Sequence, residues 1–140
     1  MNEQIQEVMQ ELKETAQAAS DAWEFNEYII EQGDLLEEMP KELMTPDAKI
    51  AGCVSTVYVY GELNDGRMRY NVYSDAQIVK GLLALFVRML DGLTPQEVLN
   101  CPDEVLEAIA GKASLTPSRM NGLHAAFMQM QGIATKYKNK

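Results

Sequence analysis

Apolar residues recur every three or four positions near the start of the chain, which predicts an amphipathic helix over about residues 3–19. Its apolar positions are Ile5, Val8, Met9, Leu12, Ala16 and Ala19. A second helix is expected to end at Gly33, because glycine suits the left-handed residue that follows many helices. The apolar residues of this helix are Trp23, Phe25, Tyr28 and Ile29. Residues 35–49 contain two prolines and are predicted to be a loop with at most a short helical turn.

β-branched and aromatic residues then dominate two segments, 54–63 and 68–73, which predicts two β-strands. The four residues between them include Asp65-Gly66, a dipeptide that favours a type I′ turn because both central residues need a positive φ. The two segments are therefore expected to pair as an antiparallel hairpin with its turn in solvent.

After the hairpin, capping signals predict a series of helices. Ser74 and Gln77 have the spacing of a capping box, so the most apolar helix of the chain is expected to begin there. Asp91-Gly92 is expected to end that helix, and Thr94 with Glu97 to begin a short one. A further helix over about 102–110 should end at Gly111. Thr116-Pro117 then opens a last helix that reaches Tyr137. Helices that flank a small antiparallel sheet make the chain α+β, and its 140 residues fit a single domain spanning 1–140.

Composition narrows the classes of partner. Forty-six per cent apolar and 24% charged residues are ordinary for a globular protein, and the net charge of −9 disfavours a nucleic acid or an anionic membrane as partner. The N-terminus is acidic and amphipathic, unlike a signal peptide, and no run approaches 18 apolar residues. We therefore expect a cytoplasmic protein without a membrane anchor.

Cys53 stands out because it follows Gly52 at the junction between the loop and the first predicted strand. Cysteine is often buried for packing alone, but loops positioned by rigid elements carry many functional residues. A reactive thiol at this position would need electropositive help to form the thiolate. Candidate sources are Lys49, the helix start after Ser74, and the helix start that carries Arg119. Asp75, expected one residue into its helix, suits the helix dipole and could pair with Arg119.

The other candidate groups are weaker. His124 is expected at the surface or half-buried on the last helix, and Cys101 at a helix boundary is expected to be structural. Two distant cysteines and one distant histidine are too few for a metal or iron–sulfur site, and no nucleotide-binding or hydrolase motif is present.

Several segments occur in the order seen in the SufE family: GCVSTVYV, YSDAQIVKGLLAL after the hairpin, LTPQEV and LTPSRMNGL. From about Trp23 to Tyr137 the chain resembles these sulfur acceptors for cysteine desulfurases of the SufS type. The resemblance implies a SufE/IscU-like fold with a third strand, formed within residues 63–73 or by splitting the first strand. Cys53 then corresponds to the sulfur-accepting residue, supported by Gly52, Ser55, Asp75 and Arg119. The chain departs from the family pattern at Tyr58, Ala48 and Cys101.

What the resemblance implies is sulfur transfer in iron–sulfur cluster assembly. Cys53 would take persulfide sulfur from the desulfurase, stimulate that enzyme and pass the sulfur to a scaffold complex. Pyridoxal phosphate would belong to the desulfurase, so no cofactor or metal is expected here. The chain would be a transfer partner rather than an enzyme, as a monomer or weak homodimer. Two alternatives stay open: a redox enzyme or sensor using Cys53 with Cys101, and a helical adaptor that needs neither cysteine.

Overall fold

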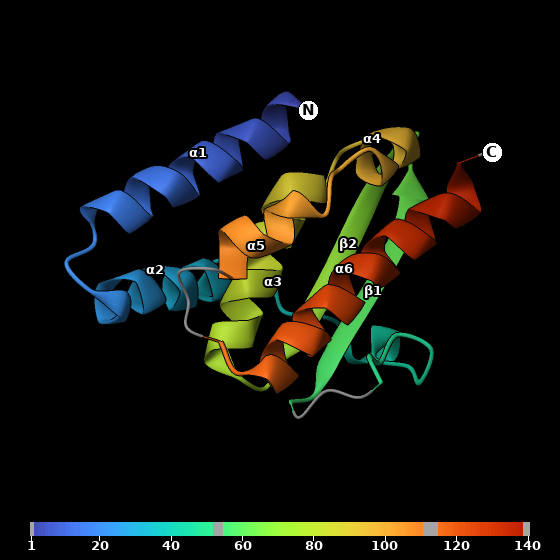
Figure 1. The fold of residues 1–140 in the computed structure, drawn as a ribbon. Helices are drawn as coiled ribbons and strands as arrows, with labels where there is room; N and C mark the ends of the chain where they lie inside the picture. The colour runs from blue at the N-terminus through green and yellow to red at the C-terminus, as the bar shows by residue number, and fades with distance from the viewer. Residues whose placement is uncertain (1, 52–54, 111–114, 139–140) are drawn as a thin grey trace.

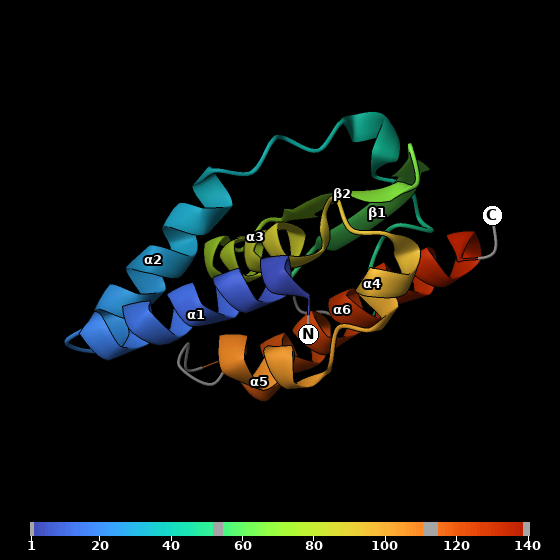
Figure 2. The same cartoon turned by 90° about the horizontal axis from the view of Figure 1, so that it is seen from above.

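We describe the fold from a computed structural model, covering residues 2–51, 55–110 and 115–138. The elements are α1 (Glu3–Ala18), α2 (Ala22–Asp34), the 3₁₀ turn η1 (Lys41–Leu43), β1 (Val57–Asn64), β2 (Arg67–Ser74), α3 (Gln77–Leu90), α4 (Pro95–Leu99), α5 (Glu104–Ala110) and α6 (Pro117–Tyr137). The two strands form a hairpin with α3 and α6 packed on one face, while α1 and α2 lie on the outer side of α3 (Figures 1 and 2). The α+β prediction is confirmed.

The hairpin forms as its turn sequence predicts. Asn64 pairs with Arg67 across the turn, and the central residues Asp65 and Gly66 have φ values of 53° and 79°. Both are positive, as a type I′ turn requires. Every second residue of β2, and of β1 from Val57 to Gly61, is buried, so one face of the hairpin packs on the helices and the other faces outward.

Among the described residues the sheet has two strands, and the expected origin of a third strand is wrong. Neither residues 63–73 nor a split of the first strand provides it. Instead, residues 48–50 lie along β1: the Val59 N–H donates to the Ala48 carbonyl and the Ile50 N–H to the Val57 carbonyl, both at 2.9 Å. This pairing stays short because the turn that contains Pro46 directly precedes it.

The core is centred on α3, whose residues 82–86 are all almost completely buried. Phe86 of α3 and Phe127 of α6 pack with ring centroids 5.4 Å apart. The buried stripe predicted for the last helix is confirmed at Leu123, Phe127 and Met130. No helix in the described ranges is long and apolar enough to cross a membrane.

The role expected for Gly33 is wrong. Within the described chain, positive φ values among glycines occur at Gly66 and Gly92, and Gly33 is an ordinary helical residue one position before the end of α2. It is buried where α2 crosses α3, and a Cβ added there would lie 3.0 Å from the Gly81 backbone nitrogen. A Cβ at Gly81 would lie 1.9 Å from the Ile29 carbonyl oxygen. The two glycines therefore let the backbones of α2 and α3 approach each other closely.

Candidate functional site

Cys53 and Gly52 lie outside the described residues, so the expected site is described from the chain on either side of them. Before them, the Ile50 N–H donates to the Val57 carbonyl at 2.9 Å. This bond holds the residue before Ala51 against the first residue of β1. The described chain is therefore anchored at the start of the hairpin on the upstream side of the cysteine.

Asp75 anchors the downstream side. Its Oδ1 accepts a hydrogen bond from the Thr56 N–H at 2.9 Å, and its own N–H donates to the Thr56 carbonyl at 3.3 Å. These two hydrogen bonds between Asp75 and Thr56 fix the segment that follows Ser55. The Ser55 side chain is half-buried. We call this pair the Thr56–Asp75 clasp.

The clasp replaces two expectations about this segment. Asp75 precedes α3 and does not lie one residue into it. The Ser74–Gln77 capping box is wrong as well, because Ser74 ends β2 and its Oγ accepts from the Ala76 N–H at 3.2 Å. The helix therefore begins three residues after Ser74, and the Asp75 carboxylate is left to bind the chain after Cys53.

Arg119 lies in the first turn of α6, as expected, and is exposed. It lines a pocket of about 410 Å³ with Trp23, Asn26 and Leu115, among others. The Trp23 side chain is 71% exposed, and the buried Oδ1 of Asn26 has no hydrogen-bond partner. We call this feature the Trp23–Arg119 pocket; it combines an exposed aromatic side chain with a cation.

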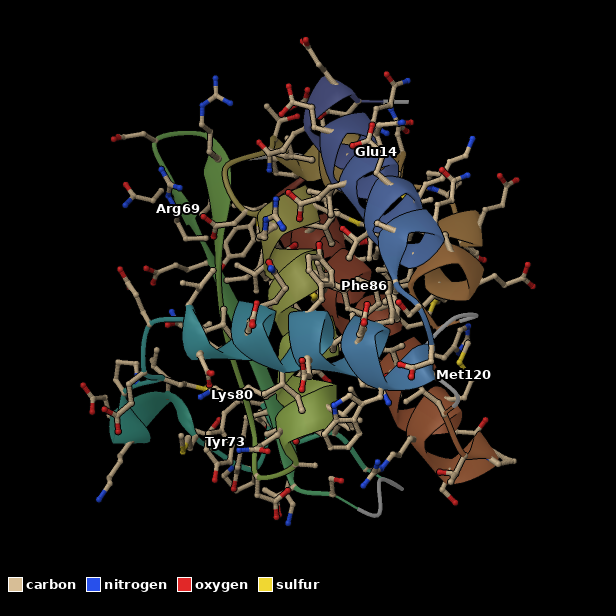
Figure 3. The ribbon with its side chains drawn as sticks, turned by 90° about the vertical axis from the view of Figure 1, so that its left-hand side faces the viewer. Glu14, Arg69, Tyr73, Lys80, Phe86 and Met120 are labelled. Carbon is tan, nitrogen blue, oxygen red and sulfur yellow. The ribbon has the colours of Figure 1, made fainter. Side chains whose placement is uncertain are left out.

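Asp75 lines a second, smaller pocket of about 300 Å³ with Asp34, Gln77 and Lys80. Ile30 borders both pockets, which makes them neighbours. Figure 3 shows the side of the molecule where α2 crosses in front of α3, with Lys80 and Tyr73 near one end of the hairpin.

The Asp75–Arg119 ion pair that the sequence suggested is not found. Within the described ranges the ion pairs closer than 4 Å are Arg69 with Asp91 and Arg88 with Glu11. Asp75 instead holds Thr56, and Arg119 faces its own pocket. Lys49 is exposed and its backbone bridges to Tyr58, so it lies on the upstream anchor. Whether either cation acts on the Cys53 thiol stays a prediction.

Sequence reasoning missed Trp23 and Thr56 as parts of the site. A signal for Trp23 was present, because Phe25, Ile29 and Gly33 recur every four residues on the buried side of α2 and Trp23 lies off that stripe. Thr56 had no such signal, since its partner Asp75 is 19 residues away in the chain.

Cys101 and His124 behave as expected. Cys101 is 3% exposed, and burial, with a smaller contribution from Asp103, raises the pKa of its thiol to about 11. The Cys101 carbonyl accepts a hydrogen bond from Gln131 Nε2. Gln131 lies about 18 Å further along α6 than Arg119, at a rise of 1.5 Å per residue, so Cys101 is bound to a different part of this helix. His124 is exposed on α6. No group of three potential metal ligands occurs in the ranges that the structure covers.

Taken together, the described part of the site offers anchored flanks, an exposed tryptophan and an arginine without an ion pair among the described residues. Aromatic and arginine side chains of this kind are enriched at protein interfaces.

Comparisons with known proteins agree with this arrangement. The family model described as "SufE: Fe-S metabolism associated domain" matches residues 10–134. An uncharacterized SufE-like protein of Synechocystis sp. is 42% identical over 112 residues, covering 80% of this chain and 70% of that protein. The solution structure of a hypothetical protein from Thermus thermophilus has a TM-score of 0.76 at 20% identity, covering 95% of this chain and 96% of that one. The last likeness shows the fold, and the family match shows an association with Fe–S metabolism.

Proposed function

Because the chain belongs to the SufE family, we propose that it accepts sulfur from a cysteine desulfurase of the SufS type and carries it as a persulfide on Cys53. The observation that carries the proposal is the double anchoring of the chain around this cysteine. The Ile50–Val57 hydrogen bond and the Thr56–Asp75 clasp confine the exchange of sulfur to one short segment. The Trp23–Arg119 pocket provides a surface for the partner.

The proposed reaction is thiol–persulfide exchange. The Cys53 thiolate attacks the outer sulfur of the donor persulfide, a new S–S bond forms on Cys53, and the S–S bond of the donor breaks. The electron pair of that bond leaves with the donor cysteine as thiolate, so no external oxidant or reductant is needed. The pyridoxal phosphate that releases sulfur from cysteine belongs to the desulfurase.

Each described residue of the site has a simple role in this proposal. Asp75 holds the segment after Cys53 through Thr56 and is a positioning residue. Arg119 offers a permanent cation to an acidic group of the desulfurase or to the thiolate itself. Trp23 supplies an exposed aromatic contact. The sulfur then passes from Cys53 to an iron–sulfur scaffold complex.

A redox enzyme that uses Cys101 as its second thiol is a poorer fit. The attacking species in disulfide formation is the thiolate, and the buried Cys101 with a pKa of about 11 is almost entirely protonated at neutral pH. Sulfur transfer needs Cys53 alone.

Intact-mass measurement tests the proposal. Purified chain is incubated with a SufS-type desulfurase and cysteine, and one added sulfur atom is expected on the wild type and on Cys101→Ser, but not on Cys53→Ser. The proposal is overturned if Cys53 gains no sulfur. Loss of the modification in Cys101→Ser, with that variant folded as judged by circular dichroism, would favour the redox alternative instead.

A further inference from the structure

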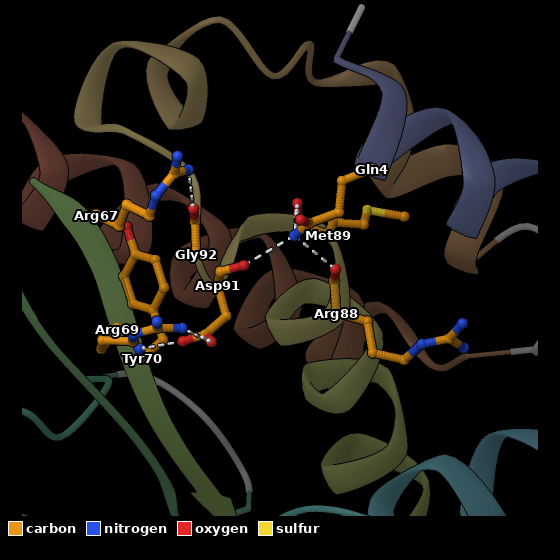
Figure 4. A network of polar contacts seen from close by, with 8 residues as sticks. All are labelled: Gln4, Arg67, Arg69, Tyr70, Arg88, Met89, Asp91 and Gly92. Carbon is orange, nitrogen blue, oxygen red and sulfur yellow. Dashed lines mark hydrogen bonds and ion pairs between the residues drawn. The ribbon is translucent and has the colours of Figure 1, made fainter.

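The outer edge of β2 is protected along its first half. The Met68 N–H donates to the Leu93 carbonyl at 2.7 Å, and the Met68 carbonyl accepts from the Gly92 N–H at 2.8 Å. Two residues further, the Tyr70 N–H donates to Asp91 Oδ1 at 2.8 Å. Figure 4 shows how Asp91, held in turn by Arg69, covers this part of the strand. The segment after α3 therefore acts as a cover for the edge.

The protection ends at Val72, the next residue whose backbone groups point outward. Val72 lies opposite Val59, whose own N–H turns away to Ala48, so the two residues form a pair without mutual hydrogen bonds. The N–H and carbonyl of Val72 thus face away from β1, and within the described chain neither has a partner. Val72 is only 4% exposed, and backbone groups this buried are almost always paired.

Val72 lines a groove of about 430 Å³. The groove is lined by β2 from Arg69 to Val72, by residues of α3 and the segment after it, and by the end of α2 and residues 35–37. The lining residues outside β2 and 35–37 are Gln32, Ala84, Val87, Arg88 and Asp91. On the rim, the Leu35 side chain is 78% exposed, the most exposed large apolar side chain among the described residues. The groove therefore combines a strand residue with unpaired backbone groups and an exposed apolar side chain, Leu35.

We propose that this groove binds an extended segment of a partner protein, which adds to the hairpin as a strand along the second half of β2. An extended backbone presents an N–H and a carbonyl on the same side of one residue, which is the complement of the open pair on Val72. The segment carries an apolar side chain at the position over Ala84 and Val87 and polar side chains at alternate positions. Leu35 packs on its outer side.

A single segment fits this groove better than a second copy of the chain. Residues 35–37 close the far side, so a second hairpin would have to bring its own helices against this wall. The lining includes two basic residues, Arg69 and Arg88, and two acidic residues, Glu37 and Asp91, so its charges balance in sign. The surface does not include Trp23 or Arg119, so it is distinct from the Trp23–Arg119 pocket.

Amide NMR on the ¹⁵N-labelled full chain tests this inference with a defined probe, a capped seven-residue peptide that alternates threonine and valine. The expected result is a saturable downfield shift of the Val72 amide as it gains a hydrogen bond. The same peptide with a methylated central backbone nitrogen should bind more weakly, because it has lost a main-chain donor.

Two matched variants complete the test. Leu35→Ser should weaken peptide binding about fivefold, equivalent to about 1 kcal/mol, whereas Met128→Ser, which removes another exposed apolar side chain from α6, should not. No shift at Val72 up to several millimolar peptide overturns the inference. A Val72 shift that follows protein concentration without peptide also overturns it, since the occupant would then be a second copy.

Discussion

At the scale of single residues, Asp75 binds the chain three positions after Cys53. It is exposed, yet both its carboxylate and its backbone N–H bind Thr56. A side chain used in this way sets the conformation of the neighbouring segment more than it contributes charge to the surface.

Asp75→Ala should loosen the segment after Cys53 without unfolding the protein. Loss of one hydrogen bond to a backbone N–H costs about 1 kcal/mol, so protection of the Thr56 amide against hydrogen exchange should fall about fivefold. Asp75→Asn keeps an acceptor oxygen and should retain most of the protection. Equal protection of the Thr56 amide in wild type and Asp75→Ala would show that the Thr56–Asp75 clasp does not hold this segment.

At the scale of elements, α2 and α3 are the pair whose packing depends most on a single residue. A Cβ at Gly81 would overlap the Ile29 carbonyl, which belongs to the rigid backbone of a helix and cannot move aside as a side chain would. The position of α3, and with it of Asp75 and Lys80, depends on this contact.

Gly81→Ala should therefore reduce the free energy of unfolding by about 3 kcal/mol or more in urea titrations, because overpacking a helix crossing forces the backbone to shift. Gly132→Ala is the matched control: it lies on α6 with nothing within 4 Å of the added Cβ, and it should stabilise the protein by up to about 1 kcal/mol. Similar effects from both substitutions would contradict a close crossing.

The sequence predicted those elements whose determinants are local. The hairpin turn needed only Asp65-Gly66, and the capping box of α4 needed only Thr94 and Glu97, which form both expected hydrogen bonds. The start of α3 was missed because the Ser74 hydroxyl had a nearer backbone partner. The role of Gly33 depends on Gly81, a residue distant in sequence, which no local pattern encodes. Residues 48–50 pair with β1 only a few positions further along the chain, but the prolines around them indicated a loop.

The candidate site divides in the same way. The position of Arg119 in the first turn of α6 followed from the Thr116-Pro117 signal, whereas Asp75 precedes α3 and was wrongly placed inside it. Only the folded structure shows that Asp75 and Arg119 do not pair and that Asp75 binds Thr56 instead. The expected roles of Cys53 and Gly52 rest on the family and remain predictions.

At the scale of the whole molecule, one polar cluster joins the outer helices to the core. Glu11 of α1 accepts from Arg88 of α3 and from the Tyr28 hydroxyl of α2, and Arg88 also donates to Gln32. The hydrogen bond from Arg88 is the main reason that the pKa of Glu11 lies below its usual range. A lowered folded-state pKa means that the ionised carboxylate stabilises the fold above its unfolded-state pKa, and that this stability is lost as pH falls through the folded-state value.

Glu11→Gln should cost about 0.5–1 kcal/mol near pH 7, a modest amount because both partners are partly exposed. The difference from wild type should shrink toward zero in acid, below the pKa of about 4.3 of a free glutamate. Urea unfolding near pH 7 and in acid measures the difference in the free energy of unfolding between the variant and the wild type. Glu31→Gln, which replaces an exposed residue of α2, is the control. A stability difference between Glu11→Gln and wild type that grows on acidification would contradict a lowered pKa of Glu11 in the folded state.

The anchors around Cys53 also set a limit on distance. A chain extends by at most about 3.6 Å per residue, so while the anchors hold, the Cα of Cys53 cannot lie further than about 11 Å from that of Ile50 or of Thr56. Opening the clasp moves the second tether to Val57 and lengthens it to about 14 Å. If Cys53 accepts sulfur as proposed, the donor therefore has to bring its sulfur to within this distance of the start of the hairpin.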